Sequence, residues 1–249
     1  MRIAVAGATG NIGARTVAAL RRDGHEVVGI SRSLGVDLLT GEGLADALAG
    51  VDAVVDAVSS NAVDRAESAR YFGTTTANLL AAEERAGVRH HVLLSIVGVH
   101  DVAGNAHYEG KREQERLVEA GPVPVPWTIV PATQFHDFAE MVASWTEQDG
   151  VATIAPLLVQ PVAPGDVAEV LAEVAVGAPQ GRYADVAGPE TQDLVDMARR
   201  TIQARGRTVR LVPTWDGLFG PSMAGTVLLP GANPRITPTT FDEWIAAQR

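Results

Sequence analysis

Apolar residues along the chain form short continuous runs that alternate with segments of helical spacing. The runs cover 3–6, 27–30, 53–58, 91–95 and 127–130. Continuous apolar runs of this length are typical of strands that are buried on both faces of a parallel sheet. Between them, apolar residues recur every three or four positions, which predicts amphipathic helices. The alternation predicts an α/β fold, a doubly wound parallel sheet with the strand order 3-2-1-4-5-6.

Less regular segments complete the predicted sheet and its helices. Short strands are expected at 36–38, 183–187 and 209–212. Helices are expected at 41–49, 107–119, 134–148, 166–176, 191–205 and 241–247, and a further long helix is expected before Gly87. Gly87 is the predicted stop of that long helix, and Asp166 is the predicted N-cap of the helix that it opens. Pro131 is expected to end the strand that begins at Trp127.

Three glycines separate the first predicted strand from the first predicted helix, in the stretch GATGNIG over 7–13. Such a turn leaves backbone N–H groups at a helix N-terminus, where they and the helix dipole favour a phosphate. Gly7 would allow the tight turn, Gly10 the approach of a pyrophosphate and Gly13 close packing of helix and strand. The turn therefore predicts dinucleotide binding. Its expected cofactor-binding residues are Gly7, Thr9, Gly10, Asn11, Ile12 and Gly13.

The end of the second predicted strand bears on the choice between the two nicotinamide cofactors. An Asp or Glu at this place binds a ribose 2′-hydroxyl, whereas a nearby Arg accommodates a 2′-phosphate. The chain has Ser31, Arg32 and Ser33 there, without an acid, and Arg15 lies one turn into the first predicted helix. Guanidinium groups and hydroxyls suit a phosphate monoester. We therefore expect NADP as the cofactor rather than NAD.

The composition narrows the range of functions. The 249 residues include no cysteine, which excludes disulfides, thiolate metal sites and cysteine nucleophiles. The formal net charge of -10 argues against nucleic acid as a partner. No apolar run is long enough to span a bilayer, and the chain starts directly with a core strand. We therefore expect a cytoplasmic protein with a small-molecule substrate, and the sequence leaves open whether it forms an oligomer.

Three stretches of the chain resemble one enzyme superfamily. They are the G-x-x-G-x-x-G spacing with Ala8-Thr9 inside it, the strand end Leu93-Leu94-Ser95 and the predicted helix over 108–118. These stretches resemble the atypical and extended short-chain dehydrogenase/reductases, and the resemblance covers nearly the whole chain. It implies that Asp37 lies near the adenine and that Ser59 lies beside the ribose and nicotinamide. The alternative for Asp37 is that it caps a turn.

The second half of the chain resembles the small substrate-binding part of the extended reductases. Nine of the twelve aromatic residues lie at or after Trp127. We expect one domain over 1–249, in which 1–131 mainly bind the cofactor and 132–249 form most of the substrate pocket. The expected pocket residues are Phe135, His136, Phe138, Trp215 and Phe219, with Met223 as a further candidate.

The resemblance also implies a catalytic motif, from which this chain departs. In the superfamily, a serine at the strand end, here Ser95, acts with a Tyr-x-x-x-Lys on the next helix. The tyrosine donates the proton, and the lysine lowers the tyrosine pKa and binds the nicotinamide ribose. Lys111, the only lysine in the chain, is in place, but His107 stands four residues before it and Tyr108 three. Residues three or four apart share a helix face, so both are candidates for the proton donor.

Three explanations of this altered motif remain open. In the first, His107 is the proton donor, with a pKa that Lys111 would lower. In the second, Tyr108 donates the proton. In the third there is no acid and Lys111 alone anchors the ribose. The third explanation is implied by a resemblance to reductases of the isoflavone reductase type and to redox sensors of the nitrogen-metabolite-repressor type.

Two further histidines, His100 and His136, follow predicted strands at the same sheet edge. With His107 they would line one pocket, facing either substrate or solvent. Their spacing does not match a zinc site, and no metal is expected.

The sequence as a whole predicts an NADP-dependent oxidoreductase that transfers hydride to or from a carbonyl or quinone substrate with apolar bulk. The alternative is a non-catalytic NADP(H) sensor that acts through a protein partner. The fold alone does not decide between them.

Overall fold

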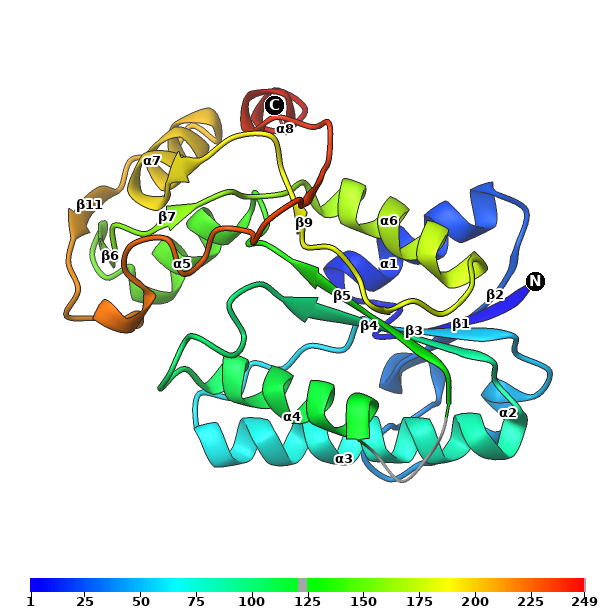
Figure 1. Ribbon diagram of the computed structural model, residues 1–249. Coiled ribbons are helices and arrows are strands. Elements are labelled where there is room, and N and C mark those ends of the chain that lie inside the picture. The colour runs from blue at the N-terminus through cyan, green and yellow to red at the C-terminus, as the bar shows by residue number, and fades with distance from the viewer. Residues whose placement is uncertain (121–124, 249) are drawn as a thin grey trace.

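A parallel sheet forms the centre of the computed structural model, which describes residues 1–120 and 125–248 (Figure 1). The sheet contains β1 (Arg2–Ala6), β2 (Glu26–Ile30), β3 (Ala53–Asp56), β4 (His90–Ile96), β5 (Trp127–Ala132), β8 (Gly181–Arg182), β9 (Val186–Ala187) and β12 (Arg235–Ile236). Its order is β2-β1-β3-β4-β5-β9-β12, with β8 paired to β5, and all these pairings are parallel. The predicted doubly wound α/β fold is confirmed.

Two layers of helices cover this sheet (Figure 1). The helices on one face are α1 (Asn11–Arg22) and α6 (Pro164–Val176), and those on the other are α2 (Leu44–Leu48), α3 (Arg65–Ala86) and α4 (Ala106–Ala120). Strands β1, β3 and β4 are buried over nearly their whole length because helices cover both faces. This double cover is the physical reason why the strands read as continuous apolar runs.

The second half of the chain adds a smaller layer beyond the carboxyl ends of β4 and β5 (Figure 1). Its elements are α5 (Phe138–Thr146), β6 (Val151–Ile154), β7 (Leu158–Val159), β10 (Gln192–Asp193), α7 (Leu194–Ala204), β11 (Arg210–Pro213), the 3-10 helix η2 (Pro221–Met223) and α8 (Phe241–Ala246). β6 pairs with β11 and β7 with β10 in two small sheets. The second half also contributes β9 and β12 to the main sheet and α6 to the helices that pack on it. The chain therefore passes back and forth between the main sheet and the smaller layer.

The strand predicted at 36–38 is wrong. After β2 the chain forms the 3-10 helix η1 (Arg32–Leu34), and Gly35 follows with a φ of 84°. The Asp37 carboxylate accepts a hydrogen bond from the Leu39 N–H at 2.8 Å, and this closes a turn where a strand was expected. The sheet therefore ends at β2, and the predicted order loses its outermost strand.

The prediction that Pro131 ends its strand is also wrong, because β5 continues to Ala132. On one side Pro131 lies opposite Ser95 of β4. On the other side, β5 pairs at Thr128 and Ile129 with β8 and then at Ala132 with β9. Pro131 falls between these two pairings, where its missing N–H breaks no ladder.

Several other predicted elements have different ends. Of the strand at 183–187 only β9 forms, and β8 lies just before the predicted start. The helices at 134–148 and 191–205 shorten to α5 and α7. Gly87 ends α3 with a φ of 72°, as predicted. Asp166 does not cap its helix, because α6 begins at Pro164 with Ala163 as N-cap. The Asp166 carboxylate instead accepts hydrogen bonds from the N–H and hydroxyl of Thr239.

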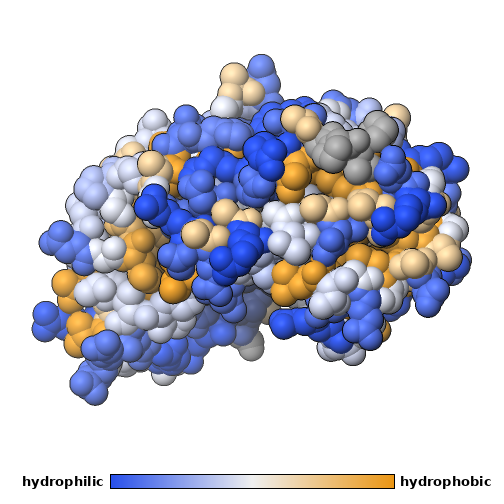
Figure 2. Space-filling view, turned by 90° about the horizontal axis from the view of Figure 1, so that it is seen from below, coloured by the Kyte–Doolittle hydropathy of each residue, from blue (hydrophilic) through white to orange (hydrophobic). Residues whose placement is uncertain are grey.

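Figure 2 shows the molecule from below, from the side of α3 and α4, where hydrophilic residues separate several hydrophobic areas. None of the helices in the described part of the chain combines the length and the apolar character that a bilayer crossing requires.

Candidate functional site

The glycine turn after β1 is shaped by contacts that leave no room for side chains. Gly7 has a φ of 75°, and a Cβ there would lie 2.7 Å from the Ala57 carbonyl oxygen. A Cβ on Gly13 would lie 2.1 Å from the Gly7 carbonyl oxygen. Gly10 differs, because a Cβ would meet nothing closer than 3.3 Å and the residue is exposed. The structure thus confirms the tight turn at Gly7 and the close packing at Gly13, and leaves Gly10 open to an approaching group.

The N-terminus of α1 beside this turn has free hydrogen-bond donors. Gly10 is the N-cap, no side chain caps the helix and no acid lies in its first turn. The N–H groups of Asn11, Ile12 and Gly13 therefore find no acceptor among the residues that the structure describes. Uncapped donors at the positive end of a helix fit a pyrophosphate.

Asn11 connects the glycine turn to the second half of the chain. Its Nδ2 donates to the Asp137 carboxylate at 2.7 Å, and its Oδ1 accepts from Arg15 Nε at 3.1 Å. Burial raises the Asp137 pKa, although the Asn11 hydrogen bond opposes this. Asp137 was not among the predicted site residues, because only the fold brings the residues after β5 beside the turn after β1.

The residues at the end of β2 lie together as the sequence suggested. Arg32 is exposed in η1, and the hydroxyls of Ser31 and Ser33 share a hydrogen bond of 3.0 Å. Arg15, by contrast, donates a hydrogen bond to the Asn11 side chain, one turn earlier on α1. Asp37 closes its turn through the Leu39 N–H. A guanidinium and two hydroxyls without a neighbouring acid at the strand end fit a 2′-phosphate.

Thr9 and Ser59 are both exposed beside this turn. Ser59 lies two residues beyond Ala57, whose carbonyl oxygen approaches Gly7. The loop after β3 therefore runs close to the glycine turn, where a bound dinucleotide would pass.

Lys111 on α4 reaches the carboxyl ends of the two central strands. Its Nζ donates to the carbonyl oxygens of Val58 at 3.2 Å and of Leu94 at 2.9 Å, and it lies 5.0 Å from the centre of the Phe72 ring. The residue is only 5% exposed. Burial lowers the Lys111 pKa to about 8, although Asp56 and Glu115 oppose this. An ammonium has three N–H donors, so one remains for a ligand.

Asp56 fixes the loop that carries one of these acceptors. This buried carboxylate accepts from the Val58 N–H at 3.0 Å and from Gln114 Nε2 at 3.0 Å. Gln114 lies on α4 three residues after Lys111, so Asp56 ties the end of β3 to the helix that carries the lysine. Sequence reasoning missed this role, since an Asp inside an apolar run gives no sign of its partner.

The hydroxyl of Ser95, near the end of β4, is hydrogen-bonded to another side chain of the protein. The hydroxyl donates to Glu115, which is fully buried and also holds His100 Nε2 at 2.7 Å and Arg182 Nη1 at 2.9 Å. Burial raises the Glu115 pKa, but Arg182, Ser95 and His100 together outweigh it and hold the pKa below its usual range. Glu115 and Arg182 were not among the predicted site residues.

His107 and Tyr108 are neighbours in sequence but pack into different cores. The His107 ring lies edge-on to Phe72 at 5.6 Å, and burial together with Lys111 lowers its pKa to about 4. Tyr108 packs into the hydrophobic cluster of the second half, and its Oη accepts from Gln134 Nε2 at 3.2 Å. Burial raises the Tyr108 pKa. At neutral pH both groups are therefore uncharged.

The predicted pocket residues do not all come together. Phe138 and Phe219 are 5.7 Å apart between ring centres, and Trp215 and Met223 join the same cluster. Phe135 packs instead against the cluster that includes the main-sheet strands.

The prediction that three histidines line one pocket is wrong. His136 is 1% exposed, and its ring packs against Phe241 and Trp244. His100 is held at Glu115, and His107 lies against Phe72. Among the described residues, no group of three or more acidic or histidine side chains is placed to hold a metal ion.

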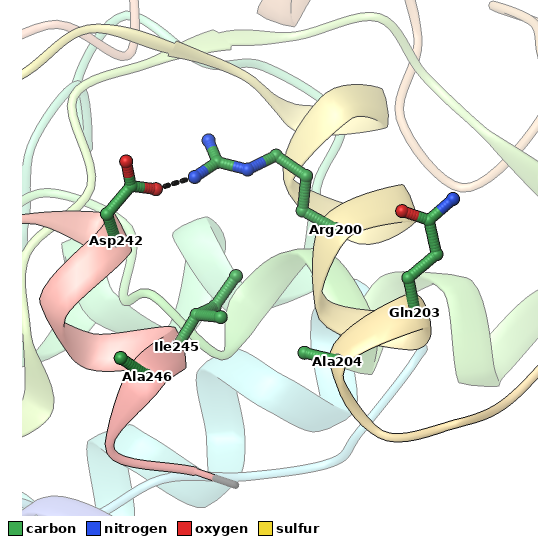
Figure 3. Close-up of a pocket in the computed structure, with 6 residues that line it drawn as sticks. All are labelled: Arg200, Gln203, Ala204, Asp242, Ile245 and Ala246. Carbon is green, nitrogen blue, oxygen red and sulfur yellow. Dashed lines mark ion pairs between the residues drawn. The ribbon is translucent and has the colours of Figure 1, made fainter.

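A hollow between α7 and α8 lies apart from these groups (Figure 3). Its lining residues are Arg200, Gln203, Ala204, Asp242, Ile245 and Ala246. Arg200 is paired with Asp242 across it and lies over the Phe241 ring. None of the predicted site residues lines this hollow, so its position argues against a part in cofactor binding.

Comparison with known proteins agrees with this geometry. A family model described as NAD(P)H-binding matches residues 33–176. The photosystem II assembly factor Ycf39 of Synechocystis is 32% identical over 111 residues, which are 39% of this chain and 34% of that protein. The chain therefore spans about a third of the length of this relative.

Solved structures share the fold at low identity. A short-chain dehydrogenase/reductase superfamily protein from Agrobacterium tumefaciens with bound NAD has a TM-score of 0.72 and 18% identity, covering 99% of this chain and 95% of that one. The NADPH-dependent quinone oxidoreductase QOR2 of Escherichia coli, complexed with NADPH, has a TM-score of 0.68 and 17% identity, covering 99% of both chains. Because the family model covers more than half of the 249 residues, this chain is a member of the NAD(P)H-binding family.

Proposed function

We propose that the protein is an NADP-dependent oxidoreductase that transfers hydride between the cofactor and a carbonyl or quinone substrate with apolar bulk. The observation that carries this proposal is the position of Lys111. Its Nζ lies at the carboxyl ends of β3 and β4, and the loop after β3 touches the glycine turn. Ligands of open α/β sheets bind at this edge.

The residues around this edge fit a nicotinamide dinucleotide. The free N–H groups at the start of α1 would hold the pyrophosphate, and Arg32 with its two neighbouring serines would hold the 2′-phosphate. Ser59 and the remaining N–H of Lys111 would bind the nicotinamide ribose. When bound, NADPH would supply the hydride. The NADPH named with the quinone oxidoreductase QOR2 supports this choice of cofactor.

Tyr108 is our choice for the proton donor. In the reducing direction, hydride adds to the substrate, the carbonyl oxygen takes one proton, and NADPH becomes NADP⁺. His107 has a pKa of about 4 and holds no proton to give at neutral pH. The phenol of Tyr108 keeps its proton over the whole neutral range, and it lies in the apolar cluster that contains Phe138 and Phe219.

One observation favours the alternative, a non-catalytic NADP(H) sensor that acts through a protein partner. The Ser95 hydroxyl donates to the buried Glu115 carboxylate, whereas Tyr108 contacts Gln134. The serine and tyrosine of the superfamily's motif are therefore held by different partners. An oxidoreductase would need Tyr108 to act without help from Ser95.

The experiment that separates these functions combines cofactor binding with turnover. Calorimetry with NADPH and NADH measures whether the protein binds NADPH more tightly. Loss of the absorbance of reduced nicotinamide in the presence of a panel of quinones and aromatic carbonyls then measures hydride transfer. Turnover supports the oxidoreductase, and tight NADPH binding without turnover on any compound supports the sensor. The acidic charge and the apolar pocket residues lead us to expect a small-molecule substrate in the cytoplasm rather than nucleic acid.

A further inference from the structure

A buried polar pair keeps hydrogen-bonding capacity that the protein does not use. Gln134 lies two residues beyond β5 and is 5% exposed, and Tyr108 in the first turn of α4 is 4% exposed. Gln134 Nε2 donates to Tyr108 Oη at 3.2 Å. Gln134 Oε1 is buried without a hydrogen-bond partner. The phenolic proton likewise has no acceptor within the described ranges 1–120 and 125–248.

Such a pair calls for a ligand atom. An unpaired buried polar group destabilises the folded protein, so buried donors and acceptors are nearly always satisfied. The pair offers one acceptor, Gln134 Oε1, and one donor, the Tyr108 O–H. A ligand hydroxyl would satisfy both groups, and a ligand carbonyl oxygen would accept from the phenol.

The surroundings of the pair are apolar. Tyr108 belongs to the hydrophobic cluster that also contains Val99, Met223 and Leu228, with Phe138 and Trp215 packed against it. A ligand that reaches the pair therefore presents an oxygen at one end and an apolar body to these side chains.

The segment 215–230 covers this cluster through Phe219, Met223 and Leu228. Its backbone hydrogen bonds join residues within the segment, such as the Met223 N–H to the Gly220 carbonyl. One side-chain bond, from the Ser222 hydroxyl to the Ala103 carbonyl at 3.2 Å, connects it to the loop before α4. Apolar contacts within this cluster thus supply most of its attachment.

We propose that Gln134 and Tyr108 form the polar end of the substrate pocket and bind the oxygen of a carbonyl or hydroxyl compound with an aromatic body. This inference rests on the proposed function and makes Gln134 a specificity-determining residue. In the reducing direction, the carbonyl oxygen accepts from Tyr108, and the product hydroxyl also donates to Gln134. The pair therefore complements both substrate and product.

The test measures ligand binding without turnover. Naphthoquinone and naphthalene, which share an apolar body and differ in their oxygens, are titrated by calorimetry into the complex with NADP⁺. We expect naphthoquinone to bind about tenfold tighter than naphthalene. Gln134→Met, which keeps the side-chain length, and Tyr108→Phe should each remove most of this difference and leave the NADP⁺ affinity unchanged. The exposed Gln203→Met is the matched control and should keep the full difference.

Equal binding of both compounds by the natural protein, or full discrimination in both variants, would overturn the inference. Circular dichroism identifies a variant that does not fold, and the other variant then decides. The proposed function fails separately, when NADPH binds but no compound of the panel is reduced. Turnover of naphthoquinone with unchanged substrate KM in Gln134→Met would leave the proposed function standing and refute the role of Gln134.

Discussion

Two groups of buried polar residues that meet on α4 differ in how many of their hydrogen bonds the protein itself supplies. In the first half, Lys111, Asp56 and Glu115 each hold two or more partners at the carboxyl ends of the strands. Where the second half packs against α4, Gln134 and Tyr108 share one hydrogen bond, and Gln134 Oε1 has no partner among the residues that the structure describes. The protein's own groups hold Lys111, Asp56 and Glu115 in place, although Gln114 Oε1 beside them is also unpaired. The Gln134–Tyr108 pair keeps an acceptor and a donor that, as we propose, a substrate oxygen uses.

Substitutions in the glycine turn should have the largest effect. Gly10→Val should weaken NADP⁺ binding by about 100-fold or more, because the side chain fills the space that the pyrophosphate needs and blocks the helix donors. The protein should remain folded, since Gly10 is exposed and a Cβ there, 3.3 Å from the Gly7 carbonyl oxygen, requires only a small shift of the turn. Calorimetry measures the affinity and thermal unfolding the stability.

Gly13→Val is the contrasting variant. Its Cβ would clash with the Gly7 carbonyl oxygen, so the loss should appear in folding and thermal stability. A folded Gly10→Val protein that binds NADP⁺ normally would show that the glycine turn has only a structural role.

Removal of the Tyr108 phenol should have the next largest effect. Tyr108→Phe should lower kcat by about 100-fold, as loss of a general acid does, and leave cofactor affinity intact. His107→Phe should change kcat little, because this ring is already neutral above a pH of about 4. The kcat of the natural protein should stay flat from about pH 6 to about pH 9, since the Tyr108 pKa is raised above its usual value near 10. A rate that falls steadily with rising pH in the acidic range would point to His107 instead.

Substitution of Lys111 should have an intermediate effect, on the affinity for NADP⁺. Lys111→Met should weaken NADP⁺ binding by about tenfold through loss of its remaining N–H donor. Burial lowers the Lys111 pKa to about 8, so the protonated donor dominates below this pH and is lost above it. The affinity of the natural protein should therefore decrease as the pH rises through about 8, and Lys111→Met should lack this decrease. Calorimetry over a pH series measures both, and an identical pH dependence in the two proteins would remove Lys111 from the cofactor site.

The arginines should give the smallest effect. Arg32→Ala should reduce the preference for NADP⁺ over NAD⁺ by about tenfold, because the exposed guanidinium at the end of β2 would hold the 2′-phosphate. Arg15→Ala should reduce it less, since Arg15 is bonded to Asn11. Affinities for both dinucleotides measure this preference, and a preference that survives Arg32→Ala would place the 2′-phosphate elsewhere.

The sequence predicted the first half well because its signals are local. Continuous apolar runs are typical of strands covered on both faces, and the close contact at Gly13 lies within one strand-turn-helix unit. The contact at Gly7, by contrast, comes from Ala57 in the loop after β3. The strand at 36–38 failed because an Asp turn after Gly35 competes with a weak apolar pattern.

Contacts that join segments far apart in the sequence were less predictable, in both halves of the chain. Nothing near Asp137 in the sequence indicates its bond to Asn11, and nothing near Ser95 indicates Glu115. The spacing of His107 and Tyr108 before Lys111 placed both near one helix face. Packing against Phe72 on one side and the second-half cluster on the other separates them.

A single-turnover measurement tests the proposed oxidoreductase most directly. The complex with NADPH is mixed with naphthoquinone, and the absorbance of reduced nicotinamide is followed in the natural protein and in Tyr108→Phe. Hydride transfer predicts a loss of absorbance in the natural protein that is about 100-fold slower in the variant. Stable absorbance in the natural protein with naphthoquinone and with every other quinone and aromatic carbonyl tested, while NADPH stays bound, would contradict it and identify a sensor.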